Sequence, residues 1–445
     1  MDILIQASQL LLSLSILIVL HELGHFIPAK IFKTRVEKFY LFFDPWFSLL
    51  KKKINDTEYG VGWLPLGGYV KISGMIDESM DKEQMKKNPE PWEFRSKPAW
   101  QRLIIMIGGV FVNLILGVFI YSMTLFSYGD KYLPNKNIKD GLWCVDELAN
   151  ELGFKNGDKV ISADGVSVER YSDVLEKIIT SEKVVVERNG SYVALEMPAD
   201  LIERFLENEN KLILFPRIPV VINSVLEGSN AELAGLKQND IVLSVNGAPS
   251  IYFDQFKGLL SSFADQEVEL KIRRNGEEKR LMAKVSKEAT LGFSPSTPSI
   301  KQLERLGVYR LASFKYGFFA SFPAGYKKAI KKLNSYITQF KMILSPSTGA
   351  YKGVGGFGAI GSMFPPSWNW EVFWNLTAFL SLMLAFMNIL PIPALDGGHV
   401  FFLIYEILVG KPAPEKVMEY SQAVGMILLL SLLVFANGND IARLF

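Results

Sequence analysis

The sequence predicts a polytopic α-helical membrane protein with four transmembrane helices, a membrane-reentrant β-hairpin and two α+β modules inserted between the second and third spans. Three observations support this fold class. The mean hydropathy of the 445 residues is positive, which is unusual for a soluble protein. Four apolar runs reach the roughly 20 residues that a bilayer-spanning helix needs. The polar region between the second and third runs contains an internal repeat.

The four apolar runs cover about residues 4–27, 101–127, 373–407 and 418–437. The first run has no basic n-region, and no small-residue cleavage pattern follows its apolar core. We therefore interpret it as a retained span rather than as a signal peptide.

Composition narrows the classes of function. The net charge of +2 is too small to indicate a nucleic-acid partner. The single cysteine, Cys144, excludes an internal disulfide framework and metal sites with two cysteine ligands. Only three histidines are present, His21, His25 and His399, so any histidine chemistry must use these positions.

The placement of lysine and arginine predicts the orientation of the chain. Basic residues gather in the 28–100 loop, and Lys411 and Lys416 lie between the third and fourth spans. Both loops are therefore expected in the cytoplasm, with both termini and residues 128–370 on the outer side. The expected segments are a first span (1–30), a cytoplasmic segment with the hairpin (31–100), a second span (101–128), two modules (129–213 and 214–294), a basic amphipathic helical segment at the outer membrane surface (295–370), a third transmembrane segment (371–410), and a fourth span with the C-terminus (411–445).

The internal repeat predicts two similar modules. "ELGFKNGDKVISADGVSV" at 151–168 aligns with "ELAGLKQNDIVLSVNGAPS" at 232–250. Each copy reads as short strands joined by Asx-Gly turns, with a helix near 171–179 or 253–262. The second copy resembles a PDZ domain, and the first is similar but lacks the Ala-Gly-Leu sequence. PDZ folds bind peptides by adding a strand to a sheet edge, so peptide ligands are one expectation, and two spacers that bind nothing are the alternative.

The segment 326–344, "YKKAIKKLNSYITQFKMIL", has the pattern of an amphipathic helix. Ile330, Leu333, Ile337 and Phe340 recur at helical spacing, with lysines around the other face. This pattern favours a helix at the membrane surface. A helix that packs in the soluble part of the protein is the alternative.

The first apolar run contains the pattern H-E-x-x-H, formed by His21, Glu22 and His25. Positions i and i+4 share a helix face, so both imidazoles can reach one metal ion. The adjacent carboxylate of Glu22 can accept a proton from an attacking water. Ionisable groups within a span are costly and usually functional. The alternative is a polar end of the span that reaches the membrane surface and binds no metal.

A catalytic zinc usually has three protein ligands, and Asp396 is the candidate for the third. It lies inside the third apolar run, after the helix-breaking Pro391 and Pro393. Irregular backbone at membrane depth is tolerated where it lines a cavity, so this carboxylate can turn inward. A cytoplasmic turn after a shorter span is the alternative. We expect His399 to pack near the site rather than to bind the metal.

Together these motifs resemble those of the site-2 protease family. H-E-L-G-H in the first span, N-x-x-P-x-P-x-x-D-G at 388–397 and the two PDZ-like copies are similar to the bacterial regulator-of-sigma-E protease branch, which has two tandem PDZ domains. The resemblance implies an intramembrane zinc metalloprotease. It implies His21, His25 and Asp396 as Zn²⁺ ligands and Glu22 as catalytic base. It also implies a multi-pass protein of the bacterial inner membrane, with its PDZ domains on the periplasmic side.

Two further segments are candidates for substrate binding. Asn388 offers an amide donor near the site, and its alternative role is a polar contact between spans. Residues 59–75 alternate apolar residues with glycines, as a β-hairpin does, and "PLGGYVK" is typical of the membrane-reentrant loop of the branch. An edge strand there would pair with an extended substrate, which makes Gly67, Gly68 and Tyr69 candidate substrate-binding residues. A structural turn on the cytoplasmic face is the alternative.

The function predicted from these motifs is hydrolysis of a peptide bond within the transmembrane segment of single-span membrane proteins. The resemblance suggests anti-sigma factors or remnant signal peptides as substrates after a first cleavage, with the PDZ copies as a size filter. Two other functions compete with this one. They are a membrane-anchored PDZ scaffold with a non-catalytic metal site, and a metal-ion transporter, because intramembrane His, Asp and Glu residues also mark ion pathways.

Overall fold

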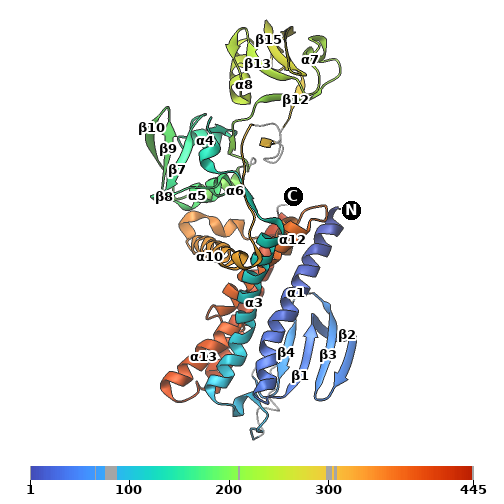
Figure 1. The fold of residues 1–445 in the computed structure, drawn as a ribbon. Helices are drawn as coiled ribbons and strands as arrows, with labels where there is room; N and C mark the ends of the chain where they lie inside the picture. Colours follow the sequence, from blue (N-terminus) through green and yellow to red (C-terminus); the bar gives the residue numbers. More distant parts are fainter. Residues whose placement is uncertain are drawn as a thin grey trace. The chain divides into compact units, whose positions relative to one another are not determined.

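The structure is a computed structural model that describes residues 2–65, 67–75, 88–208, 211–296, 303–304 and 308–442. The chain forms two compact units (Figure 1). The first, here called the membrane unit, consists of Met1–Gly129, Lys315–Leu344 and Tyr351–Phe445. The second, here called the inserted unit, consists of Asp130–Phe314 and Ser345–Ala350.

Within the described residues, four helices of the membrane unit are long and apolar enough to cross a membrane. This confirms the prediction of four candidate membrane helices at the level of length and composition. They are α1 (Asp2–Ile31), α3 (Ala99–Tyr128), α12 (Trp370–Ile389) and α14 (Glu415–Ala442).

The third apolar run forms two helices and not a single span over 373–407. Helix α12 ends at Ile389, and α13 (Asp396–Val409) begins after a short break. Pro391 and Pro393 have no backbone N–H to continue the helix, and Ala394 between them and α13 has a φ of 78°. The break therefore places Asp396 at the start of a new helix.

Helices α1 and α3 approach each other closely through glycines. A Cβ atom on Gly24 of α1 would lie 2.5 Å from the carbonyl oxygen of Gly108 on α3, and one on Gly108 would clash with the carbonyl of Gly24. Small residues at such crossings let helix backbones pack without intervening side chains. The crossing brings the H-E-x-x-H turn of α1 against the middle of α3.

A four-stranded sheet follows α1 in the membrane unit, in the order β2-β3-β1-β4. The predicted hairpin within 59–75 is wrong, because β1 lies between β3 and β4 and pairs with both. The hairpin that forms joins β2 to β3, through a tight turn in which Asn55 has a φ of 53°. The strands are β1 (Val36–Leu41), β2 (Phe43–Ile54), β3 (Thr57–Leu64) and β4 (Tyr69–Ile72).

Two more helices belong to the membrane unit, α10 (Phe318–Ile343) and α11 (Phe357–Ser362). Helix α10 contains nearly all of the predicted amphipathic segment 326–344 but begins eight residues before it, and its buried residues are all small, Ser321, Gly325 and Ala329. Its lysine Lys328 donates to Oδ1 of Asn375 on α12 at 2.7 Å. Helix α10 therefore packs on the transmembrane helices, and the alternative placement in the soluble part is wrong.

The first module of the inserted unit is built on a sheet of order β10-β9-β7-β8, with β6 paired to β11 and β5 paired to β18. Its elements are β5 (Asp130–Tyr132), β6 (Leu142–Cys144), α4 (Glu147–Glu151), β7 (Lys159–Ala163), β8 (Val166–Ser167), α5 (Val174–Thr180), β9 (Lys183–Arg188), β10 (Ser191–Glu196), α6 (Leu201–Glu207), β11 (Leu214–Pro216) and β18 (Ala312–Phe314).

The second module has a sheet of order β16-β15-β13-β12-β17, with β14 paired to β13. Its elements are β12 (Val220–Val225), α7 (Asn230–Leu233), β13 (Ile241–Val245), β14 (Ala248–Pro249), α8 (Phe253–Ser262), β15 (Glu267–Arg274), β16 (Glu277–Lys284) and β17 (Phe293–Pro295). Each copy of the sequence repeat contains an equivalent ion pair between an arginine and a buried aspartate. Arg188 binds Asp158 at 2.7 Å in the first module, and Arg274 binds Asp240 at 2.6 Å in the second.

Candidate metal centre

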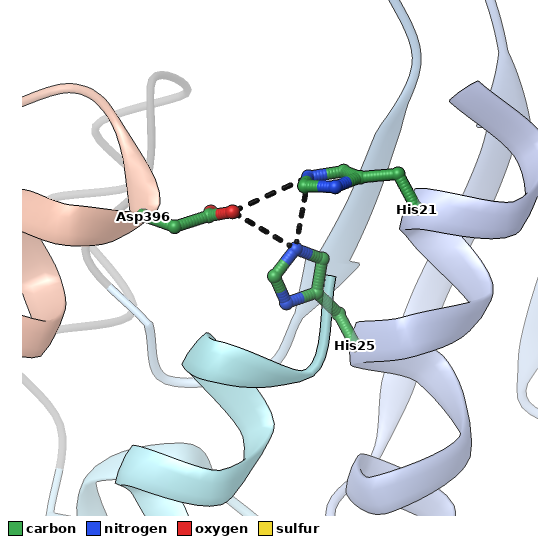
Figure 2. Close-up of side chains that lie close together, drawn as sticks. All are labelled: His21, His25 and Asp396. Atoms are coloured by element: carbon green, nitrogen blue, oxygen red, sulfur yellow. Dashed lines mark hydrogen bonds and ion pairs between the residues drawn. The ribbon is translucent and has the colours of Figure 1, made fainter. Parts of the chain in front are cut away.

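Two segments far apart in the chain bring three potential metal ligands together (Figure 2). His21 and His25 lie one turn apart on α1, and Asp396 is the first residue of α13. The two imidazole Nε2 atoms are 3.2 Å apart. Oδ2 of Asp396 lies 3.3 Å from Nε2 of His21 and 3.4 Å from Nε2 of His25. The three atoms thus form a nearly equilateral triangle.

The spacing and chemistry of these atoms fit a zinc ion. Ligand atoms about 2.0–2.1 Å from a tetrahedral zinc ion lie about 3.3 Å from one another, which matches the triangle. Oδ2 of Asp396 is buried and accepts no hydrogen bond from the residues that the structure describes. A buried carboxylate oxygen without a donor is costly, and a bound cation removes that cost. Two nitrogen ligands and one oxygen ligand also leave a fourth position open.

Helix α3 contacts the Nδ1 atoms of both imidazoles, whereas their Nε2 atoms lie near Asp396. Nδ1 of His25 donates to the carbonyl oxygen of Ile105 at 2.8 Å. Nδ1 of His21 lies 3.2 Å from Nδ2 of the Asn113 side chain. Gly109, halfway between them on α3, faces the two rings, and a Cβ atom there would lie 2.6 Å from Cε1 of His21. Helix α3 therefore holds the imidazole planes independently of a bound ion.

Local backbone geometry explains how Asp396 reaches the histidines. Gly398 packs against the break that precedes α13, where a Cβ atom would lie 2.7 Å from the carbonyl oxygen of Ile392. A Cβ atom on the neighbouring Gly397 would overlap the carbonyl oxygen of Leu390. The Gly-Gly pair after Asp396 is thus required by the tight fold of the chain at this point.

A cavity of about 770 Å³ is lined in part by the three candidate ligands. Glu22 and His399 line it, together with Gly68, Tyr69 at the start of β4, and Gln422 from α14. Gly68 lies beside Glu22, because a Cβ atom on this glycine would be 3.6 Å from Cγ of the glutamate. The cavity therefore joins the metal centre to the edge strand of the sheet.

Comparison with known proteins identifies the family. The model of "Peptidase family M50" matches residues 9–432, which is most of the chain. The chain belongs to peptidase family M50. It is therefore a zinc-dependent metalloprotease and an integral membrane protein.

Three curated relatives of this M50 peptidase match it over 98% or more of their length. It is 27% identical to the regulator of sigma E protease of Haemophilus influenzae, with 98% of both chains covered. It is also 27% identical to the regulator of sigma-E protease RseP of Escherichia coli, again with 98% of both chains covered. Identity to the protease RseP of Yersinia pestis is 28%, with 100% of both chains covered.

The structure places the other predicted site residues at different distances from the metal centre. Nδ2 of Asn388, near the end of α12, lies 3.4 Å from Nε2 of His21. Gly68 and Tyr69 line the cavity, whereas Gly67 is not among its lining residues. His399 lines the cavity but does not belong to the cluster of three ligand atoms.

Sequence reasoning missed three residues at this site. Asn113 and Gly109 of α3 contact the imidazoles, and Asp44 accepts a hydrogen bond of 2.8 Å from the hydroxyl of Tyr69. The sequence did indicate a role for Asn113, because burying an amide inside an apolar run costs free energy unless it has a hydrogen-bond partner. Asp44 gave no such signal, since it lies outside the apolar runs, where a carboxylate is common.

Proposed function

We propose that this M50 peptidase hydrolyses a peptide bond within the transmembrane segment of single-span membrane proteins. The observation that carries this proposal is the position of the three candidate ligands, two on the apolar helix α1 and one beside the break between α12 and α13. Such a centre meets substrates inside the membrane and not in bulk water. The names of the relatives connect them with sigma-E regulation, which favours anti-sigma factors as substrates, with remnant signal peptides as a second group.

His21, His25 and Asp396 are the proposed zinc ligands, and Glu22 is the proposed catalytic base. When bound, zinc acidifies water and polarises the carbonyl of the scissile bond. Glu22 lies in the same cavity, where it accepts the proton of the attacking water and returns it to the departing amine. Asn388 donates its amide N–H to the substrate backbone and holds the scissile carbonyl toward the ligands.

A transmembrane substrate must be extended before attack, because a helix hides its peptide bonds in internal hydrogen bonds. Strand β4 offers a place for extended chain, since β1 pairs with one of its edges and no described strand pairs with the other. Tyr69 starts this strand, and Gly68, which precedes it, lies next to Glu22. We therefore propose that the substrate adds to the free edge of β4 as an extended strand, with Gly67, Gly68 and Tyr69 as substrate-binding residues.

The proposed orientation places both termini and the inserted unit on the periplasmic side of the inner membrane, and the 28–100 loop in the cytoplasm. The clusters of lysine and arginine support it. The two modules, at 129–213 and 214–294, are proposed as PDZ domains that keep proteins with bulky outer domains away from the cavity. We also propose that these modules can bind peptides.

The test uses the purified full-length protein in detergent with a model single-span substrate. Wild type is expected to cleave the substrate and to contain one zinc ion. Glu22→Gln is expected to keep its zinc and its fold and to lose cleavage. Unchanged proteolysis in this variant would eliminate Glu22 as the base.

A second comparison separates the enzyme from its rivals. Asp396→Asn is expected to lose zinc as well as cleavage, and an unaltered zinc content would remove Asp396 from the ligand set. In vesicles, zinc flux without proteolysis would favour the transporter. Stoichiometric zinc with neither flux nor proteolysis would favour the scaffold.

A further inference from the structure

Three residues on one face of α3 lie against the two histidines of α1. Ile105, Gly109 and Asn113 are spaced by four residues, so they lie on one face of α3. Ile105 contacts His25, Asn113 contacts His21, and Gly109 lies between the two rings. Each imidazole therefore has one contact on α3 for its Nδ1 atom and turns its Nε2 atom toward Asp396.

The contact of His25 defines the protonation of its ring. A backbone carbonyl oxygen only accepts hydrogen bonds, so the Nδ1 atom 2.8 Å from the carbonyl of Ile105 carries the proton. The Nε2 atom of neutral His25 then has a free lone pair. This is the tautomer that a metal ligand bound through Nε2 requires.

To bind a metal through Nε2, His21 needs the same tautomer as His25. The acceptor for its Nδ1–H must then be a side chain, that of Asn113. Asn113 is fully buried, and its Oδ1 atom has no hydrogen-bond partner among the described residues. A half-turn of the carboxamide places Oδ1, instead of Nδ2, opposite Nδ1 of His21. This orientation gives the buried oxygen a donor and gives the His21 Nδ1–H an acceptor.

The backbone of α3 is fixed at this position. Oγ of Ser381 on α12 donates to the carbonyl oxygen of Asn113 at 2.7 Å. This bond fixes the backbone from which the carboxamide of Asn113 extends toward His21. Asn113 can therefore orient the ring of His21 and does not merely follow it.

We infer that Asn113 is a positioning residue, which holds His21 in the Nδ1–H tautomer with Nε2 directed at the metal. This inference rests on the proposed role of His21 as a zinc ligand. Asn113 is neither one of the three candidate ligands nor a lining residue of the cavity, so it acts through His21. Partners of this kind typically change metal affinity by about 10- to 100-fold when they are removed.

The test measures zinc affinity by competition with a chelator, in the full-length protein in detergent, for wild type, Asn113→Leu and Asn113→Asp. Leucine has a similar size but no acceptor, and zinc affinity is expected to fall by about 10- to 100-fold. Aspartate keeps an acceptor, and its zinc affinity is expected to equal or exceed that of wild type. Thr124→Val is the matched control, because it removes another buried polar group of α3, whose described hydrogen bond stays within the helix and goes to the carbonyl of Tyr121.

A spectroscopic readout follows the tautomer directly. The chain has only three histidines, so protein labelled with ¹⁵N at histidine alone gives few imidazole signals. In zinc-loaded wild type, Nδ1 of His21 is expected to carry a proton in slow exchange with water. This signal is expected to exchange faster or to shift in Asn113→Leu and to persist in Thr124→Val.

The outcomes separate this inference from the proposed function. Wild-type zinc affinity in Asn113→Leu, or a loss in Asn113→Asp as large as in Asn113→Leu, would overturn the positioning role. If His21→Ala itself leaves zinc affinity unchanged, the ligand set fails and the inference fails with it. If His21→Ala loses zinc while Asn113→Leu does not, only the positioning role fails.

Discussion

The substitution Gly109→Ala tests the packing of α3 against the metal centre. The added Cβ atom would lie 2.6 Å from Cε1 and 2.8 Å from Nδ1 of His21, and closer still to Nε2 of His25. Ordinary contacts of a Cβ atom begin near 3.4 Å, so the ring of His21 must retreat by about 0.8 Å. Metal–ligand distances tolerate deviations of only about 0.2 Å. The methyl group is therefore expected to displace the imidazoles well beyond what zinc binding allows.

The expected result is a loss of zinc affinity of at least 100-fold, because the change disturbs the ligands themselves and not only their hydrogen-bond partners. Overpacking is expected to lower the free energy of unfolding by about 1–3 kcal/mol as well. Both quantities are measurable in detergent, by zinc competition with a chelator and by thermal unfolding of the zinc-free protein. Cleavage of the model substrate is expected to disappear together with the zinc.

Gly438→Ala on α14 is the matched control. It also replaces a helical glycine by alanine, but among the described residues no atom lies within 4 Å of the added Cβ, apart from neighbouring atoms of its own helix. Zinc affinity is expected to stay at the wild-type value, with a slight gain in stability from the better helix propensity of alanine. Wild-type zinc affinity and cleavage in Gly109→Ala would refute the proposed close packing of α3 against the two rings.

Three further predictions concern other parts of the chain. Arg274→Met leaves the fully buried carboxylate of Asp240 without its charge partner and is expected to destabilise the second module by about 3–5 kcal/mol, measured by chemical unfolding. Burial and nearby carboxylates raise the pKa of the Cys144 thiol from 9.0 to about 11, so its alkylation at pH 8 is expected to be about 100-fold slower than in the unfolded chain and to accelerate up to pH 11. Equal rates in folded and unfolded protein would contradict the burial of this thiol. Tyr69→Phe removes the hydrogen bond to Asp44 and is expected to raise KM by about fivefold with zinc content unchanged, while an unaltered KM would argue against a role of this contact in substrate binding.

The sequence was most informative where an ionisable residue lies in an apolar segment. Placing ionisable side chains in apolar runs costs free energy, as for His21 and His25 in the first run and Asp396 in the third. This cost indicates that the three side chains interact with a common group, such as a metal ion. The structure brings their ligand atoms within 3.2–3.4 Å of one another. The break after Ile389 was likewise indicated by Pro391 and Pro393.

The sequence was least informative where pairing is not local. The glycine-rich segment 59–75 alternates like a hairpin, but the alternation only predicts strands and not their neighbours. Strand β1, which precedes β2 in the chain, lies between β3 and β4 in the sheet. The role of Gly109 was not predictable, and for Asn113 only the need for a partner was, because both roles depend on which face of α3 meets α1.

The distance along the chain between the ligands has a consequence for biosynthesis. Synthesis proceeds from the N-terminus, so the turn with His21 and His25 enters the membrane long before Asp396 is made. A nascent or truncated chain that ends before α13 has only two of the three proposed ligands. With the proposed ligand set, hydrolytic activity is therefore expected only after Asp396 has been synthesised and has joined the two histidines.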